Sequence, residues 1–364
     1  MKVIRHTDAD FPKRLQELTA SSSLFDPGIE QRTRAILGAV QARGDAALLE
    51  FTERFDGARL SVDQLRLNHA ELMAASLKAD ESLRSAVAEA EKNIATFARK
   101  SRRHGWQSKN SHGAKVGEKF DPFRRVGVYV PGGTAPLVST ALMTVTLAKV
   151  AGCPEIAVCT PCGKDGSVNP ALLFAARAAG ATEIYRVGGA QAIAAMAYGT
   201  ATIGRVQKIF GPGNAYVVAA KRLLVGQVAI DLLPGPSEVL VLADDTAIPA
   251  FAAADMLAQA EHGSGHERVW LVTTSAKVLN AVQKEIAKQL PKLARRRFIE
   301  RVLDDNTWLV QVKTLEDAVA VANQLAPEHC EVMTRNPRKL SEKILTAGAI
   351  FLGPWSPTVL GDYV

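Results

Sequence analysis

The sequence is poor in cysteine and contains no long apolar run. Four of its 364 residues are cysteine, at positions 153, 159, 162 and 330. This scattered spacing argues against a secreted disulfide scaffold. No apolar run is long enough to cross a bilayer, and the first residues, MKVIRHTDADF, lack the apolar core of a secretory signal. We therefore expect a cytoplasmic protein that has no membrane partner.

Aromatic residues are also scarce, at 6% of the chain, whereas the formal net charge is +7. Basic runs occur at 99–103 and 295–297, but no stretch interleaves base-stacking aromatics with cations. No helix-turn-helix or zinc-finger spacing is present either. We interpret the basic runs as solvated helix ends and predict no nucleic-acid partner. The remaining composition, 47% hydrophobic and 22% charged, is typical of an ordinary globular enzyme of more than one domain.

The hydrophobic pattern changes character near residue 105. Residues 1–104 are mainly helical in pattern, and Asp26-Pro27 is a typical helix start, a capping residue followed by a first-turn proline. After this region, short β-branched runs alternate with helical segments, which indicates βαβ units and mainly parallel sheets. The fold class predicted is α/β, with two Rossmann-like lobes at 105–244 and 245–364 behind a helical N-terminal region. The expected strands of the two lobes are Val126–Val130, Glu155–Cys159, Glu183–Val187, Val206–Phe210 and Val239–Ala243, then Val269–Val272, Trp308–Val312, Val332–Thr334 and Ala349–Leu352.

Glycine-rich turns follow several of these strands. They occupy 131–133, 188–191, 211–214 and 234–237. Ligands of open α/β sheets bind outside the carboxyl ends of strands, where glycine allows a phosphate or ring to approach the backbone. The turn at 211–214 also leads into a helix start at Asn214, which would offer free N–H donors to an anion. No turn matches G-x-G-x-x-G, so the dinucleotide fingerprint is incomplete. Four such turns, expected at the same end of one lobe, favour a nucleotide site over ordinary loops.

Cys159-Thr-Pro-Cys162 is the one C-x-x-C pair in the chain. It could be a redox pair or half of a zinc site. No second C-x-x-C is present, however, and the motif closes a strand instead of opening a helix. We interpret these cysteines as small apolar residues at a strand end.

The helix expected near 252–262 ends in Gln259, Glu261 and His262, before a Gly-Ser-Gly break. Residues three apart share one helical face, so Gln259 and His262 can address one object. Histidine nitrogen suits zinc, and the glutamine side chain offers a carbonyl oxygen. The alternative is a histidine that caps the last carbonyls of the helix. The pair alone leaves both interpretations open.

Pro327-Glu328-His329-Cys330 lies between an expected helix and an expected strand. Adjacent Glu and His offer two groups of different pKa for proton transfer near neutral pH. Cys330 adds a second possibility, because a thiolate can attack an aldehyde to form a thiohemiacetal. Its position at the start of a strand favours a place in the core.

Together these motifs resemble the histidinol dehydrogenase family, and the resemblance covers essentially the whole chain. It rests on YVPGG at 129–133, GGAQAIAA at 188–195, KIFGPGNA at 208–215, GPSEVLV at 235–241, QAEHG at 259–263, PEH at 327–329 and GDY at 361–363. Members of this family are homodimeric zinc enzymes. They use two NAD⁺ to oxidise L-histidinol through the aldehyde to L-histidine, in histidine biosynthesis.

The resemblance also implies roles for individual residues. Gln259, His262 and Asp362 would be zinc ligands, and zinc would position histidinol. Glu328 and His329 would be the catalytic acid–base pair, with His329 taking the alcohol proton and Glu328 activating the water that attacks the aldehyde. Cys330 would then be a packing residue. The implied NAD contacts are Tyr129, Gln191 and Asn214, and the implied substrate contacts are Ser237, Gln259, His262, His329 and Asp362.

One departure from the family pattern concerns the C-terminus. Family members continue beyond GDY into a segment that supplies another zinc-ligand histidine and a substrate-contacting glutamate across the dimer interface, whereas this sequence stops at Val364. A missing C-terminal segment, and a homodimer that completes the active site, are therefore expected. The alternatives are a related NAD-dependent dehydrogenase of another small primary alcohol, or a non-catalytic zinc- or nucleotide-binding form.

Overall fold

A computed structural model describes residues 1–19, 26–132 and 137–363 of the chain. The chain folds into two compact units, which are described separately. Unit 1 comprises Met1–Ser23 and Gly235–Gly361, and unit 2 comprises Leu24–Pro234 and Asp362–Val364. Among the described residues, no helix is long and apolar enough to span a membrane.

Unit 2 is built on a parallel five-stranded sheet in the order β6-β5-β4-β7-β8. Counted from its first strand this order is 3-2-1-4-5, as in Rossmann folds, and it reverses between β4 and β7. The strands are β4 (Arg125–Tyr129), β5 (Glu155–Thr160), β6 (Glu183–Arg186), β7 (Lys208–Phe210) and β8 (Ala229–Ile230). The strands β4 and β5 are mainly apolar and buried on both faces, as expected for a covered parallel sheet, whereas the buried β6 carries Glu183 and Arg186.

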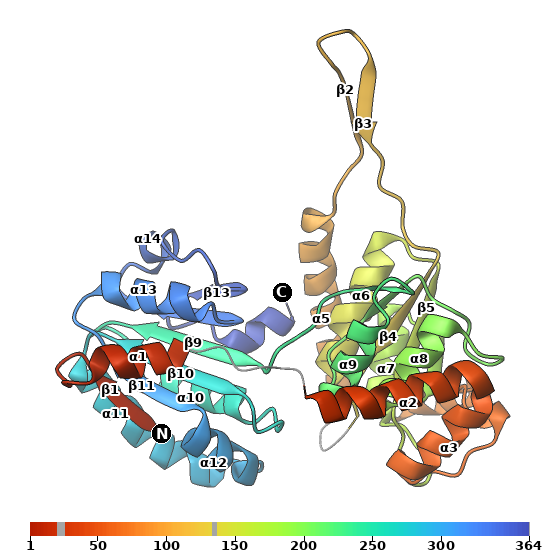
Figure 1. Ribbon diagram of the computed structural model, residues 1–364, viewed down its shortest axis with the longest axis horizontal. Coiled ribbons are helices and arrows are strands. Elements are labelled where there is room, and N and C mark those ends of the chain that lie inside the picture. Colours follow the sequence, from red (N-terminus) through yellow and green to blue (C-terminus); the bar gives the residue numbers. More distant parts are fainter. Residues whose placement is uncertain (20–25, 133–136, 364) are drawn as a thin grey trace. The chain divides into compact units, whose positions relative to one another are not determined.

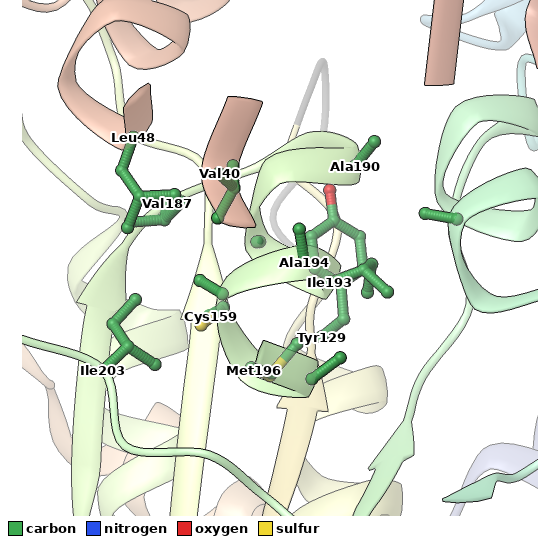
Figure 2. Packing of buried hydrophobic residues seen from close by; sticks show 14 of the residues in the cluster. Val40, Leu48, Tyr129, Cys159, Val187, Ala190, Ile193, Ala194, Met196 and Ile203 are labelled. Atoms are coloured by element: carbon green, nitrogen blue, oxygen red, sulfur yellow. The ribbon is translucent and has the colours of Figure 1, made fainter. Parts of the chain in front are cut away.

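Two layers of helices cover this sheet (Figure 1). One layer, with α2, α3, α8 and α9, encloses the cluster of Figure 2, in which Val40 and Leu48 pack toward Ile193 and Met196. The other layer contains α4 to α7. The helices are α2 (Pro27–Arg43), α3 (Asp45–Asp56), α4 (His69–Lys78), α5 (Glu81–Ser101), α6 (Val138–Ala151), α7 (Pro170–Ala179), α8 (Gly189–Tyr198) and α9 (Ala215–Leu223), with a 3₁₀ turn η1 at Val62–Gln64.

An antiparallel ribbon of β2 (Trp106–Lys109) and β3 (Lys115–Glu118) projects from unit 2 (Figure 1). Every residue of both strands is exposed. The polar pattern of these strands gave no signal for them in the sequence.

Unit 1 is built on a parallel six-stranded sheet in the order β1-β11-β10-β9-β12-β13. Apart from the edge strand β1, this is again the order 3-2-1-4-5, which reverses between β9 and β12. The strands are β1 (Lys2–Arg5), β9 (Glu238–Ala243), β10 (Arg268–Thr273), β11 (Thr307–Gln311), β12 (His329–Met333) and β13 (Ala349–Leu352). Helices α10, α11 and α12 cover one face, and α1 and α13 cover the other. The helices are α1 (Phe11–Thr19), α10 (Pro249–Ala260), α11 (Ala276–Gln289), α12 (Arg296–Asp305), α13 (Leu315–Leu325) and α14 (Pro337–Ser341), with 3₁₀ turns η2 (Leu290–Lys292) and η3 (Thr358–Asp362).

The two Rossmann-like lobes are present, but the domain boundaries differ from those expected. Residues 1–104 do not form a separate region, because β1 pairs with β11 in unit 1 whereas α2 to α5 cover the sheet of unit 2. The strand expected to end the first lobe, β9, lies in the middle of unit 1, where β10 and β12 flank it on either side. Its apolar EVLVLA run is suited to that central place, buried on both faces.

Candidate functional site

The first candidate site is a cavity of about 1300 Å³ in unit 2. It lies where β4 and β7 end, at the point where the strand order reverses. In open α/β sheets this position is the usual ligand site. The three residues expected to contact NAD, Tyr129, Gln191 and Asn214, all line it. The glycine turns that follow β4, β6 and β7 contribute Gly132, Gly189 and the approach to Asn214, whereas Gly133 lies outside the described residues.

Tyr129 fixes the start of α8 at the cavity wall. The backbone N–H of Gly189 donates a hydrogen bond to the Tyr129 hydroxyl at 3.0 Å. Gly189 has φ +63°, a backbone conformation that glycine adopts without strain. Tyr129 is 3% exposed, and its burial raises the pKa of the hydroxyl to about 12. It is therefore a neutral group at physiological pH, suited to hydrogen bonding and ring packing.

Gln191 is a buried amide that lacks hydrogen-bond partners. The side chain is 1% exposed, and neither its oxygen nor its nitrogen has a partner among the described residues. Leaving such a group unsatisfied costs about 1–3 kcal/mol. A buried polar group that lines a cavity without partners is a natural contact for a bound ligand.

Asn214 caps helix α9 at the mouth of the same cavity. Its Oδ1 accepts hydrogen bonds from the N–H groups of Tyr216 at 3.0 Å and Val217 at 3.2 Å. Of the first N–H groups of α9, only that of Ala215 is left for an anionic ligand, together with the Asn214 amide nitrogen. Phosphate binding at this turn remains a prediction.

Asp56, the last residue of α3, also lines the cavity and was not predicted from the sequence. Its Oδ2 is buried and has no hydrogen-bond partner among the described residues, and burial raises the pKa of Asp56 to about 6. In the sequence, Asp56 is followed by Gly57, which predicts only the end of a helix, and no other residue of α3 suggests a binding site.

The C-x-x-C pair matches the packing interpretation. All four cysteines of the chain are free. Burial raises the pKa of Cys159 to about 12 and that of Cys162 to about 11. A reactive cysteine needs a lowered pKa, so neither thiol is activated for redox chemistry here. Cys162 contributes to the cavity wall.

The fourth glycine turn, at 234–237, does not belong to the same end of the same lobe as the other three. It leads into β9, so Ser237 lies at the amino end of the unit 1 sheet. Its backbone carbonyl accepts a hydrogen bond from the N–H of Arg268 at 3.1 Å, and its side chain is half-buried.

Glu328 and His329 also lie at the amino end of the unit 1 sheet. His329 opens β12, next to β9, and both side chains engage the backbone of Glu238. The Glu238 N–H donates to Glu328 Oε2 at 3.1 Å, and His329 Nδ1 lies 3.0 Å from the Glu238 carbonyl oxygen. A carbonyl only accepts, so Nδ1 carries the proton and Nε2 keeps its lone pair. Glu238 itself was missed, because a backbone contact leaves no residue-type signal.

Helix α10 runs antiparallel to β9, so Gln259 and His262 at its end also lie near the amino end of the unit 1 sheet. Gln259 is 3% exposed, and its amide nitrogen has no hydrogen-bond partner among the described residues. His262 Nδ1 lies 3.1 Å from the Gln259 carbonyl oxygen. This contact is the helix-capping role considered from the sequence. The same contact places the proton on Nδ1 and leaves Nε2 free to bind a metal, so capping and ligation are compatible.

Asp362 ends η3 and is half-buried. The chain just before it returns to the sheet, since Gly361 lies against the Phe351 ring, which in turn lies 5.9 Å from the His329 ring. Across 1–19, 26–132 and 137–363, no group of three or more His, Cys, Asp or Glu could hold a metal ion. The expected ligand set relies on the amide of Gln259 to accompany the single histidine and aspartate.

Cys330 occupies the core, as its position at the start of a strand suggested. It is fully buried, and burial raises the pKa of its thiol to about 12. Successive residues of a strand point to opposite faces, so Cys330 points away from the face of His329. Burial and the raised pKa favour a packing role for Cys330 over that of a thiolate nucleophile.

Comparison with known proteins gives one consistent family. The family model described as histidinol dehydrogenase matches residues 20–364. The chain is 46% identical to histidinol dehydrogenase of Heliobacterium mobile, an alignment that covers 100% of this chain and 84% of the relative. It is 47% identical to the Synechococcus enzyme, over 92% of this chain and 77% of that relative. The crystal structure of histidinol dehydrogenase from Elizabethkingia anophelis superposes with a TM-score of 0.94 at 35% identity, covering 100% of this chain and 83% of that one. The chain therefore belongs to the histidinol dehydrogenase family, and with it to the oxidoreductases.

Proposed function

We propose that this chain oxidises L-histidinol through the aldehyde to L-histidine, the closing reactions of histidine biosynthesis, with NAD⁺ as the electron acceptor. The observation that carries the proposal is the pair of contacts to the Glu238 backbone. These contacts hold Glu328 and His329 side by side at the amino end of the unit 1 sheet. Fixing both side chains in advance reduces the entropy lost when substrate and catalytic groups are aligned.

His329 would act as the base of the alcohol oxidation. With Nδ1 donating to the Glu238 carbonyl, Nε2 is the atom that accepts the hydroxyl proton of histidinol. Glu328 would accept a proton from the water that attacks the aldehyde. Its side chain is half-exposed, so water can reach it. Ser237, at the same amino end of the sheet, would form a hydrogen bond with the substrate.

NAD would occupy the cavity of unit 2, against Tyr129, Gln191 and Asn214. The buried and unpartnered amide of Gln191 fits a polar group of the cofactor, and the start of α9 fits its pyrophosphate. When bound, the nicotinamide supplies a hydride acceptor for both oxidation steps.

Gln259, His262 and Asp362 are the proposed zinc ligands. The donor set fits the metal, because His262 presents a free Nε2, Gln259 can offer its side-chain carbonyl oxygen and Asp362 a carboxylate. When bound, zinc supplies a fixed point that orients the imidazole and amino nitrogens of histidinol. Gln259, His262, His329 and Asp362 would thereby also contact the substrate.

We further propose a cytoplasmic homodimer whose active site is completed by the partner. The ribbon of β2 and β3 supports self-association, because two-stranded ribbons are marginally stable alone and this one exposes Trp106 and Val116. The four free cysteines agree with a reducing compartment. Analytical ultracentrifugation should show a dimer, and Trp106→Lys should shift the equilibrium toward the monomer. A monomeric unaltered chain would contradict the dimer.

The function is tested by following NADH formation with histidinol and with a panel of other small primary alcohols. We expect two NADH per histidinol consumed, histidine as the product, and loss of turnover when zinc is chelated and its recovery when zinc is restored. If another alcohol were oxidised faster than histidinol, that alcohol would replace histidinol as the proposed substrate. Binding of zinc and NAD⁺ by calorimetry without any turnover would instead support a non-catalytic form.

A further inference from the structure

Two acidic side chains face each other inside unit 1. Glu331 lies on β12 and is 0% exposed, and Asp255 lies on α10 and is 6% exposed. Each carboxyl group shifts the pKa of the other, so the two are neighbours. Neither oxygen of Glu331, however, has a hydrogen-bond partner among the described residues as long as both groups are ionised. None of the ion pairs among the described residues involves either side chain. A buried carboxylate pair without a cation is costly, so its presence calls for a physical explanation.

The surroundings of the pair favour one proton between the two groups. Glu331 lies in register with Val241 of β9 and Phe351 of β13, which are both apolar. Burial, together with the neighbouring Asp255, raises the pKa of Glu331 to about 10. As an ionised group, Glu331 would have no hydrogen-bond donor for either oxygen. As a protonated group it donates its O–H to Asp255, in the way that two close carboxyls share one proton.

The backbone N–H of Thr358, the first residue of η3, also lies beside Asp255 and lowers the pKa of its carboxyl group. The pair therefore ties together three chain segments that are distant in sequence. Each of them carries a proposed functional residue close by. His329 lies two positions before Glu331 on the same face of β12, Gln259 lies one helical turn after Asp255 on α10, and Asp362 lies at the other end of η3.

We propose that Asp255 and Glu331 are positioning residues, which share a single proton and thereby fix β12, α10 and η3 in the arrangement that the reaction requires. Neither residue touches the substrate in this mechanism. The hydrogen bond sets the spacing between the His329 base and the side chains proposed to hold zinc. The expected effect on turnover rests on the proposed function. The expected effect on how β12, α10 and η3 are held together rests on the fold alone.

Two substitutions of Glu331 distinguish the effect of its hydrogen bond to Asp255 from the effect of its side-chain volume. Glu331→Gln keeps the shape and an N–H that can donate to ionised Asp255. Glu331→Leu keeps much of the volume but removes the donor. Met333→Leu, on the same face of β12, is the matched control for a core change. Loss of a supporting contact of this kind typically lowers metal affinity or activity by about 10–100-fold.

We expect Glu331→Leu to lower kcat for histidinol and zinc affinity within that range, and Glu331→Gln and Met333→Leu to remain near the unaltered chain. Hydrogen exchange of the η3 amides should accelerate in Glu331→Leu alone. The infrared band of a protonated carboxylic acid, present at pH 7 in the unaltered chain, should disappear in Glu331→Gln. Infrared and hydrogen exchange need no turnover, so they decide the fate of the pair even if the proposed reaction is absent.

Several results would overturn the proposal. One is the absence of a protonated-carboxyl band from the unaltered chain. Another is unchanged η3 exchange in Glu331→Leu. A third is a loss of activity in Glu331→Gln as large as that in Glu331→Leu, which would show that the shared hydrogen bond is not what positions the site. If Glu331→Leu does not fold, the infrared band and the activity of Glu331→Gln still carry the test.

Discussion

The ammonium group of Lys221 donates a hydrogen bond to the backbone carbonyl of Gly211 at 3.0 Å, from a side chain that is 1% exposed. Asp231 accepts from the N–H of the same glycine at 2.8 Å and forms an ion pair with Lys221. The N–H and the carbonyl of Gly211 are thus both held by the pair of Lys221 and Asp231, in the turn that leads to Asn214. A Cβ at Gly211 would lie 2.0 Å from the Tyr129 carbonyl oxygen, so the turn has no room to move toward β4.

Replacing Lys221 with methionine should therefore destabilise unit 2 and weaken NAD⁺ binding. The change leaves Asp231 and the Gly211 carbonyl without their partner, at a cost of about 2 kcal/mol in the free energy of unfolding. Denaturant unfolding and calorimetric NAD⁺ titration measure the two effects. Lys92→Met, on the exposed side of α5, is the control. Equal stability of the two variants would refute the role of the clamp.

Gln191→Leu should separate stability from binding. Because the amide has no partner in the ligand-free protein, its removal should leave stability unchanged or raise it by about 1 kcal/mol. NAD⁺ affinity should fall about tenfold, since a hydrogen-bonding contact with the cofactor is lost. Unfolding without ligand, followed by NAD⁺ titration, tests both parts against the exposed Gln283→Leu. Unaltered NAD⁺ affinity would remove Gln191 from the cofactor site.

Much of this arrangement could be predicted from the sequence, because the strands concerned are apolar runs followed by glycine turns. That pattern predicts that the turns after β4, β6 and β7 gather at one end of a parallel sheet. The choice of Tyr129, Gln191 and Asn214 as NAD contacts rests on the resemblance to the family. The edge strand β1 could not be predicted. It pairs with β11 across about three hundred residues, and four residues of mixed polarity carry no signal for such a partner.

The remaining differences also have physical causes. The sequence shows that β9 is a buried strand, but not which sheet contains it, since both sheets accept the same apolar run. Glu331 and Asp255 were overlooked because acidic residues in elements are normally expected at the surface. Their partnership depends on the packing of α10 against β12, which residue types alone do not specify.

Asp56→Asn should change how stability depends on pH. The folded-state pKa of Asp56 is about 6, raised by burial from the ordinary 3.8. Its contribution is therefore fully present below pH 3.8 and is lost as the pH rises through 6. Relative to the unaltered chain, Asp56→Asn should be more stable at pH 7 than at pH 4. Urea unfolding at both pH values measures this difference, and a pH-independent difference would contradict it.

Cys330→Ala should keep the enzyme active. The thiol is buried, has a raised pKa and points into the core, so only packing should suffer, by about 1 kcal/mol. Steady-state kinetics and thermal unfolding measure the two quantities. A folded Cys330→Ala protein without turnover would restore the thiohemiacetal mechanism.

The proposed reaction depends most on His329 as the base that accepts the alcohol proton. The most direct measurement is the rate of NADH formation from histidinol by His329→Asn, compared with His112→Asn at an exposed site. Loss of a general base should lower kcat by about 10²–10⁴-fold, while NAD⁺ binding in the cavity of unit 2 stays unchanged. A His329→Asn rate equal to that of His112→Asn would contradict the proposed mechanism.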